Sequence, residues 1–316
     1  MTPDLRSPLA VVCHDAGACN VILPWLRRPD LALRPVMAGP AARLFRDRLG
    51  AAAATGEGDE LDAAIRGAAM LLSGTGWASD LEHRARLLAR RRGVFSVAVI
   101  DHWINYPMRF ERAGEVAWPD EFWVTDEGAR AIAERCFPGA VVRCFDNLYL
   151  RAEAAAIAPP PLPSLSGGAA AQGLYVLEPM RSDWGRGVPG EFQALDHFLD
   201  HRAGAGVPAA APIRLRPHPS EPPGKYDAWL AGRRARDAGL DIALDRHATL
   251  AGAIGAATWV VGCESFALVV ALAAGRRVCS SLPPWAPPCR LPHEGIVRLA
   301  SPLPAGPARE TEPAGA

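Results

Sequence analysis

The sequence predicts an α/β protein made of two halves, each built around a mostly parallel sheet. Two observations carry this prediction. Short apolar runs alternate with helical stretches along the chain, which is the pattern of βαβ units. These runs are continuous rather than alternating, as expected of strands that are buried on both faces of a sheet. At 316 residues the chain is also long enough for two domains of ordinary size.

The first half, residues 1–150, contains the first set of these elements. Strands are expected at 9–14, 33–38, 68–73, 94–101, 121–126 and 140–145. Helices are expected at 18–27, 40–50, 79–92 and 127–136. Residues 151–172 then crowd Ala, Pro, Ser and Gly together without any period, which predicts an interdomain linker.

The second half, residues 173–300, repeats the pattern. Strands are expected at 173–179, 212–219, 240–245, 257–262 and 276–281, and helices at 190–202, 223–238, 247–255 and 265–274. Residues 301–316 have no apolar period and are expected to form a disordered tail. Two doubly wound, Rossmann-like halves place a cleft between the carboxyl ends of their sheets, and we expect the functional site there.

Composition excludes several classes of protein. The formal net charge is zero and no basic stripe occurs, which disfavours nucleic-acid binding. No apolar run reaches the roughly 20 residues that a membrane-spanning helix needs, and the N-terminus has no cleavable signal pattern. The seven cysteines form no CxxC pair, so we expect reduced core thiols in a cytoplasmic protein.

The first candidate site follows the first expected strand. A turn of small residues containing His14, Asp15 and Gly17 runs into a helix that carries Asn20. Its backbone N–H groups suit an anion or a sugar hydroxyl, and His14 or Asp15 is a candidate catalytic base. The alternative is an ordinary strand-to-helix turn in which Asp15 caps the helix.

Two further clusters follow later strands of the first half. The candidate substrate-binding residues of the first cluster are Ser73, Gly74, Thr75, Gly76 and Glu82. The glycines allow close approach of a ligand, and Glu82 either reaches an acceptor hydroxyl or completes a helix cap. The second cluster comprises Asp101, His102, Asn105 and Arg109, with Asp126 ending the next strand. Asp101 is a candidate catalytic residue; the alternatives are a buried Asp101–Arg109 pair and a helix cap at Asp126.

The second half offers two candidate nucleotide-binding segments. Arg216, His218, Pro219 and Ser220 end an expected strand, and the flanking prolines present the imidazole in a fixed direction. His218 could stabilise a departing phosphate, with Arg216 adding charge. Glu264 and Ser265 begin a helix whose N–H groups suit phosphate, the carboxylate suiting a ribose diol. An ordinary helix cap is the alternative at Ser265, and no metal-ligand cluster stands out.

This layout resembles the GT-B glycosyltransferases, most of all bacterial sialyltransferases and polysialyltransferases. His218-Pro219 matches the His-Pro motif of that family, Glu264-Ser265 resembles its nucleotide-binding serine region, and Asp126-Glu127-Gly128 matches its acidic-acidic-glycine motif. The resemblance implies a cytoplasmic enzyme of polysaccharide biosynthesis, needing no metal or other cofactor. It would move a sugar from a CMP- or UDP-linked donor, with CMP favoured, to a glycan or glycoconjugate acceptor.

The resemblance also implies roles for particular residues. A carboxylate of the first half (Asp15, Asp101 or Asp126) would deprotonate the acceptor, while His218 assists the departing phosphate. Two alternatives stay open: a nucleotide-sugar 2-epimerase, which needs one substrate only, and a non-catalytic sugar- or nucleotide-binding protein. Peripheral membrane contact, oligomeric state and the stereochemical outcome are left open too.

Overall fold

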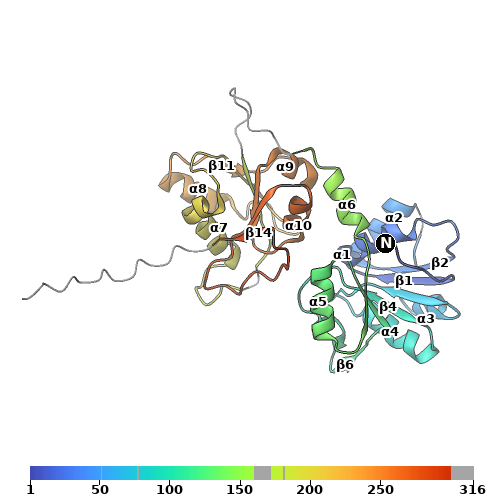
Figure 1. Ribbon diagram of the computed structural model, residues 1–316. Coiled ribbons are helices and arrows are strands. Elements are labelled where there is room, and N and C mark those ends of the chain that lie inside the picture. Colours follow the sequence, from blue (N-terminus) through green and yellow to red (C-terminus); the bar gives the residue numbers. More distant parts are fainter. Residues whose placement is uncertain (51, 77, 160–171, 181, 300–316) are drawn as a thin grey trace, which may run out of the picture. The chain divides into compact units, whose positions relative to one another are not determined.

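A computed structural model describes the chain except residues 51, 77, 160–171, 181 and 300–316. The chain divides into two compact units, shown in Figure 1. Unit 1 comprises Met1–Ala156 and Arg290–His293, and unit 2 comprises Ile157–Cys289 and Glu294–Ala316. The grouping of Arg290–His293 with unit 1 departs from the expected boundary. Of the expected linker at 151–172, residues 160–171 lie outside the described residues, as does the expected tail at 301–316.

Unit 1 is built on a six-stranded parallel sheet in the order β2-β1-β3-β4-β7-β8. Its strands are β1 (Leu9–Cys13), β2 (Leu33–Met37), β3 (Met70–Ser73), β4 (Ser96–Val99), β7 (Glu121–Val124) and β8 (Val141–Cys144). Its helices are α1 (Ala16–Ile22), α2 (Gly39–Leu49), α3 (Glu60–Ile65), α4 (Leu81–Arg92), α5 (Glu127–Cys136) and α6 (Leu148–Ala155). Short 3-10 turns η1 (Leu23–Leu26) and η2 (Pro107–Arg109), and a hairpin of β5 (Glu111–Arg112) and β6 (Glu115–Val116), complete the unit.

Unit 2 contains a second six-stranded parallel sheet, in the order β11-β10-β9-β12-β13-β14. Its strands are β9 (Gly173–Val176), β10 (Ile213–Arg216), β11 (Ile242–Leu244), β12 (Trp259–Gly262), β13 (Arg277–Ser280) and β14 (Ile296–Arg298). Its helices are α7 (Gly190–His201), η3 (Arg202–Ala205), α8 (Asp227–Arg236), α9 (Leu250–Ala256) and α10 (Phe266–Ala273). The predicted fold class, two Rossmann-like α/β halves, is confirmed.

The differences from the sequence prediction are confined to short elements. Residues 148–155, partly assigned to the linker, form α6 because the stretch consists of good helix formers and the Asn147 side chain accepts a hydrogen bond from the N–H of Leu150. Helix α3, strand β14 and the β5–β6 hairpin were not predicted. Each is too short for its periodicity to stand out from its neighbours.

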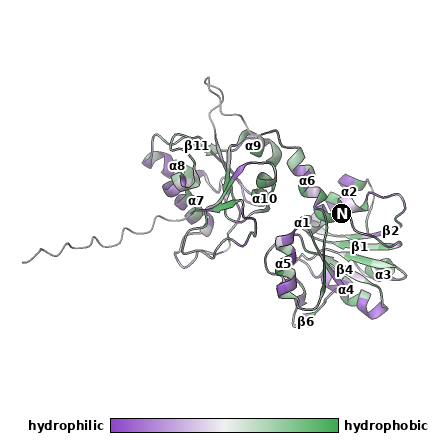
Figure 2. Ribbon diagram, viewed as in Figure 1, coloured by the Kyte–Doolittle hydropathy of each residue, from purple (hydrophilic) through white to green (hydrophobic). Residues whose placement is uncertain are grey.

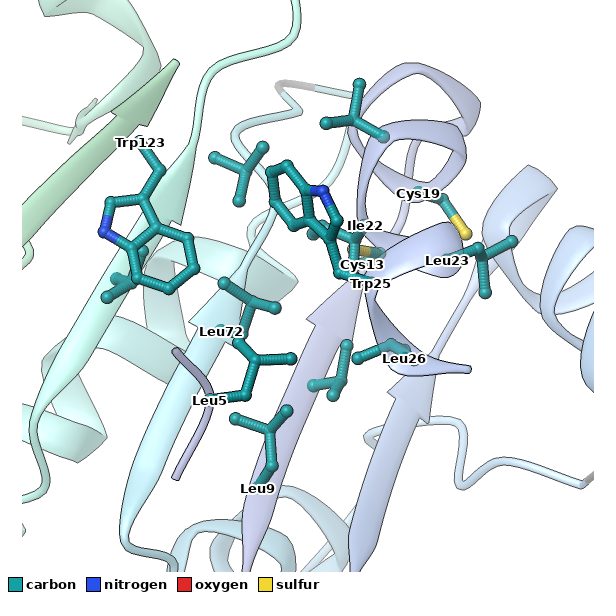
Figure 3. Close-up of a cluster of buried hydrophobic side chains, with 14 of the residues drawn as sticks. Leu5, Leu9, Cys13, Cys19, Ile22, Leu23, Trp25, Leu26, Leu72 and Trp123 are labelled. Atoms are coloured by element: carbon teal, nitrogen blue, oxygen red, sulfur yellow. The ribbon is translucent and has the colours of Figure 1, made fainter. Parts of the chain in front are cut away.

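The apolar runs of unit 1 supply both faces of its sheet, because successive side chains of a strand point to opposite sides. One face packs against α1, η1 and α2. Figure 3 shows part of this cluster, in which the rings of Trp25 and Trp123 meet edge to face with centroids 6.1 Å apart. The other face packs against α3 and α4. Figure 2 shows hydrophobic residues along β1 and α10, and hydrophilic ones on α8.

Strand order places a topological switch point in each sheet. In unit 1, β1 continues through α1 to its neighbour β2, whereas β3 continues through α4 to β4 on the opposite side. In unit 2, β9 leads through α7 to β10, and β12 leads through α10 to β13. The loops after β1 and β3, and those after β9 and β12, therefore diverge and open a crevice at the carboxyl edge of each sheet.

A buried arginine holds together the loops at the carboxyl edge of the unit 1 sheet. Arg86 of α4 is 1% exposed, and its guanidinium donates to the carbonyls of Gly74, Arg109 and Ala117 and to the Ser73 hydroxyl. Burial lowers the pKa of Arg86 to about 10, although the nearby Glu82 opposes the shift. One side chain thus ties the turn after β3 to two later loops.

We expect Arg86→Ala to lower the free energy of unfolding of unit 1 by about 3 kcal/mol, because several buried carbonyls lose their donor at once. Arg84→Ala is the matched control. Arg84 lies on the same helix, is half exposed and pairs only with Asp80 at the surface, so its loss should cost no more than about 0.5 kcal/mol. Urea unfolding followed by hydrogen exchange in unit 1 measures both, and equal effects would contradict the structural role of Arg86.

Candidate functional site

The turn after β1 is organised by two carboxylates. The backbone N–H of His14 donates to Glu82 Oε1 at 2.7 Å, and His14 Nδ1 donates to Asp15 Oδ1 at 2.7 Å. Glu82 is 1% exposed, and its Oε2 is buried without a partner in the described part of the chain. Burial raises the pKa of Glu82. The capping alternative for Glu82 is corrected: no side-chain cap is formed at α4, and Glu82 holds the turn that carries His14. Its expected contact with an acceptor hydroxyl stays a prediction.

Glycines let this turn approach its neighbours. A Cβ built on Gly17 would lie 1.9 Å from Asp101 Oδ2, and one on Gly76 would lie 2.2 Å from Asp15 Oδ2. A Cβ built on Gly74 would lie 3.2 Å from Glu82 Oε1. Side chains at these positions would displace the carboxylates. The structure therefore brings the predicted residues that follow β1, β3 and β4 together at one edge.

Asp101 is held by an arginine, as the structural alternative for this pair anticipated. Arg109 Nη1 lies 3.4 Å from Asp101 Oδ1 and 3.2 Å from both the carbonyl and the hydroxyl of Thr75. The Arg109 side chain is 7% exposed and that of Asp101 is 18% exposed. Such a pair orients a carboxylate where solvent is scarce.

The end of β7 carries a second aromatic and acidic group. Asp126 caps α5 by accepting from the N–H of Ala129 at 2.7 Å, and its other oxygen accepts from Trp103 Nε1 at 2.8 Å. The His102 ring lies beside the Trp103 ring, with centroids 5.4 Å apart. Asn105 has a positive φ of 60°, an uncommon backbone conformation outside glycine. Asp126 therefore acts as a cap and as an anchor for Trp103.

The other predicted residues of unit 1 differ in their partners. The Ser73 and Thr75 hydroxyls donate to carbonyls of β4. Asn20 lies within α1, with Oδ1 buried and without a partner among the described residues. Asp15 stands at the start of α1 but makes no side-chain cap there, so the capping alternative is wrong; its carboxylate binds the imidazole of His14 instead.

Unit 2 has a pocket of about 220 Å³ at its switch point. Its wall is partly polar and partly apolar, and the residues that line it are Val176, Leu177, Arg216, Pro217, His218, Pro219, Leu250, Ser265 and Ala267. The two predicted nucleotide-binding segments, after β10 and before α10, thus share one pocket. Ser265 also caps α10, because its hydroxyl accepts from the N–H of Ala267.

The hydrogen bonds of His218 determine where its proton lies. The N–H of Ser220 donates to His218 Nδ1 at 3.2 Å, and the Ser220 hydroxyl lies 2.7 Å from the same nitrogen. Because Nδ1 accepts, the neutral imidazole carries its proton on Nε2. The exposed ring can therefore donate from Nε2 to an anionic oxygen.

The loop that presents His218 is fixed by a charged cluster. Glu221 accepts from the backbone N–H of His218 at 3.0 Å, from Lys225 at 2.7 Å and from the Tyr226 hydroxyl at 2.7 Å. Lys225, the sole lysine of the sequence, also pairs with Glu191 of α7. Burial opposes ionisation of Glu221, but the hydrogen bonds from Lys225 and Tyr226 outweigh it and hold its pKa below the usual 4.5.

Two predicted nucleotide-binding residues have partners within unit 2. Arg216 forms an ion pair with Asp245 and donates to the carbonyl of His247 at 3.0 Å, so its charge is already balanced. Glu264 is 8% exposed, and its backbone N–H donates to Glu178 Oε1 at 2.5 Å. Glu178 follows β9, so this bond crosses the switch point between β9 and β12.

Sequence reasoning missed Arg86, Glu178 and Leu250. Arg86 lies in an arginine-rich helix end that is typical of a solvent-exposed face, and its spacing of four from Glu82 was the available signal.

In the described part of the chain, no group of three or more His, Cys, Asp or Glu is placed to hold a metal. No helix of that part is long and apolar enough to cross a membrane.

We expect Gly17→Ala to destabilise unit 1 by more than about 1 kcal/mol, because its methyl group would occupy the position of the Asp101 carboxylate. In an Asp101→Ala background the same change should become neutral or stabilising, since alanine is the better helix former. Chemical denaturation of the four proteins of this double-mutant cycle measures the coupling, and additive effects would contradict the close approach.

The lowered pKa of Glu221 predicts a pH dependence. A carboxyl with a depressed folded-state pKa stabilises the fold above its unfolded-state pKa, and this contribution disappears as the pH falls through the folded value. Glu221→Gln should therefore cost the most stability near pH 7, and the difference from wild type should shrink from about pH 4.5 downward. Unfolding free energies measured between pH 7 and pH 3 check this; a constant difference would argue against it.

No protein-family model matches the sequence, and no curated protein matches it significantly. Solved structures do match its fold. The UDP-GlcNAc 2-epimerase from Methanocaldococcus jannaschii aligns over 86% of this chain and 83% of its own, with TM-score 0.55 and 8% identity. The UDP-GlcNAc 2-epimerase from Neisseria meningitidis bound to UDP-GlcNAc aligns over 86% and 81%, with TM-score 0.54 and 9% identity.

A third match is Anabaena Alr3699/HepE in complex with UDP-glucose, over 86% of this chain and 80% of its own, with TM-score 0.52 and 10% identity. At such low identity these likenesses concern the fold alone. They place the protein among chains of two Rossmann-like halves, the GT-B-like arrangement of elements, and do not single out the sialyltransferase type that the His-Pro pair resembled.

Proposed function

We propose that this protein is a sugar-nucleotide enzyme that cleaves the bond between a sugar's anomeric carbon and a uridine diphosphate. Its first candidate reaction is epimerisation of a UDP-N-acetylhexosamine at C2. The observation that carries the proposal is the pocket of unit 2, in which His218 and Ser265 converge at the switch point of a Rossmann-like sheet.

The lining of this pocket suits a nucleotide. His218 Nε2–H and the Ser265 hydroxyl are donors for phosphate oxygens. Leu250, Val176 and the prolines beside His218 supply an apolar wall for a base. As the anomeric C–O bond breaks, negative charge grows on the departing phosphate, and a donor already aimed at it stabilises the transition state.

Unit 1 supplies groups for proton transfer. Asp15 accepts a hydrogen bond from Nδ1–H of His14, so the proton of the neutral ring stays on Nδ1. The lone pair on Nε2 is then free to act as a base. Asp101, paired with Arg109, is a second carboxylate at the same edge. The proton leaves C2 as the C1–O bond to UDP breaks, which gives a sugar with a C1–C2 double bond and free UDP. A proton then returns to the opposite face of C2 while the UDP oxygen adds back to C1, so two proton-transfer groups suit an isomerase. The similarity in fold to two UDP-GlcNAc 2-epimerases supports the same choice.

Glycosyl transfer is the second candidate, favoured by the fixed His-Pro pair. It uses the same phosphate stabilisation, but its base takes the proton of an acceptor hydroxyl instead of C2. His14 is then the base and Asp15 its positioning residue, whereas the family resemblance implied a carboxylate base.

Nucleotide binding provides the first test. We expect UDP to bind, and His218→Ala and Ser265→Ala to weaken binding about ten-fold or more each, in keeping with a lost charge-assisted hydrogen bond of about 1.5–3 kcal/mol. Thr249→Ala is the matched control, because it removes an equivalent helix cap from α9 outside the pocket lining. Calorimetry with UDP, CMP and inorganic phosphate separates the bases; binding insensitive to His218 and Ser265 would sink the proposed site.

Turnover distinguishes the two reactions. Incubated with UDP-N-acetylglucosamine alone in deuterium oxide, an epimerase produces the C2 epimer and incorporates deuterium at C2, whereas a transferase needs an acceptor. We expect deuterium at C2, and His14→Ala or Asp101→Asn to slow its incorporation by about 10²–10⁴-fold. Mass spectrometry of the sugar nucleotide is the readout. No exchange, together with glycosylation of an added acceptor, would reverse the order of the candidates.

A further inference from the structure

A short segment distant in sequence belongs to unit 1. Arg290–His293 groups with unit 1, whereas the residues on either side, Cys289 and Glu294, group with unit 2. We refer to Arg290–His293 as the strap. Within it Leu291 is fully buried, and Pro292 sits against Gly128 of α5, where an added Cβ would lie 2.5 Å from Pro292 Cγ. The strap is therefore seated on unit 1 by close packing at the start of α5.

The strap places a histidine at the edge that carries the candidate site. The His293 ring meets the Trp103 ring edge to face, with centroids 4.8 Å apart. Trp103 is in turn fixed by the hydrogen bond from its Nε1 to Asp126, and His102 lies beside it. His293 thus joins residues that follow β4 and β7, although it is separated from them by more than half of the chain.

The environment of His293 is costly for a residue that only packs. Its ring is half-buried, and Nδ1 is enclosed without a hydrogen-bond partner among the described residues. Burial also lowers the pKa of His293, against the attraction of Asp126, which keeps the ring neutral near pH 7. An enclosed nitrogen without a hydrogen-bond partner costs free energy, so an apolar side chain would stabilise this position better.

We propose that His293 is a further substrate-binding residue of unit 1, contacting a hydroxyl or amide group of the sugar. Because Nδ1 is enclosed, the contact falls to Nε2, which a neutral imidazole presents as either a donor or an acceptor. A hydroxyl or an amide offers a partner for either form, whereas a phosphate would favour a cation. The Trp103 ring beside His293 supplies an apolar neighbour, next to which one such bond is selective. This inference rests on the proposed function, because it concerns the sugar part of the same substrate.

The test compares the affinities for UDP and for UDP-N-acetylglucosamine by calorimetry. His293→Ala should leave UDP binding unchanged and weaken binding of the sugar nucleotide about ten-fold, while raising KM more than it lowers kcat. His293→Gln, which retains a donor and an acceptor, should restore most of the lost affinity. His201→Ala, in helix α7 of unit 2, is the control and should change neither affinity.

A second variant tests the delivery of the residue by the strap. Gly128→Ala should displace Pro292, speed hydrogen exchange in residues 289–294 and reproduce the affinity pattern of His293→Ala. Gly232→Ala, also within a helix but with open space around the added methyl group, should do none of these.

The outcomes separate the two proposals. If UDP-N-acetylglucosamine does not bind at all, the proposed function and the role of His293 both fall. If it binds and His293→Ala leaves the ratio of the two affinities unchanged, the role of His293 alone is wrong and the proposed function stands.

Discussion

In each unit, two neighbouring strands end at the switch point. A carboxylate that follows one of them accepts a hydrogen bond from a backbone N–H in the loop after the other. Glu82 accepts from His14 in unit 1, and Glu178 accepts from Glu264 in unit 2. The loops after the two strands diverge and open a crevice. These two hydrogen bonds fix the backbone of the loops that border it. Without them, the first N–H of each loop would lack its acceptor, and the side chains that follow would lose their direction. The candidate chemistry of both units depends on this constraint.

Buried charge makes the edge of unit 1 rigid. Arg86 and Arg109 bring two guanidiniums beneath the turn after β3, and their donors are used on carbonyls, hydroxyls and the Asp101 carboxylate. Burying such groups costs free energy, which is recovered only when each donor finds an acceptor. A network satisfied in this way holds Asp101 in one orientation, as a group that transfers protons in a fixed geometry requires.

The two histidines of the candidate site are held in opposite protonation patterns. His14 donates from Nδ1 to Asp15, which leaves Nε2 as an acceptor, whereas His218 accepts at Nδ1 from the Ser220 N–H, which leaves Nε2 as a donor. The same type of side chain thereby offers an acceptor nitrogen in unit 1 and a donor nitrogen in unit 2. The difference comes from the hydrogen bond at Nδ1, which the ring donates in His14 and accepts in His218.

The sequence by itself determined the α/β class, the two halves and most strand positions, because strands buried on both faces of a parallel sheet must be continuously apolar. It also located His14, Asp101, His218 and Ser265, since polar residues directly after such strands collect at one edge of the sheet. Only the tertiary structure decided their hydrogen-bond partners. The bonds that hold His14 and Glu264 join residues 68 and 86 positions apart, and a contact over such a separation leaves no periodic trace in the sequence. The strap with His293, the buried Arg86 and the choice of donor or acceptor on each imidazole arise in the same way, from packing between segments that local patterns cannot relate.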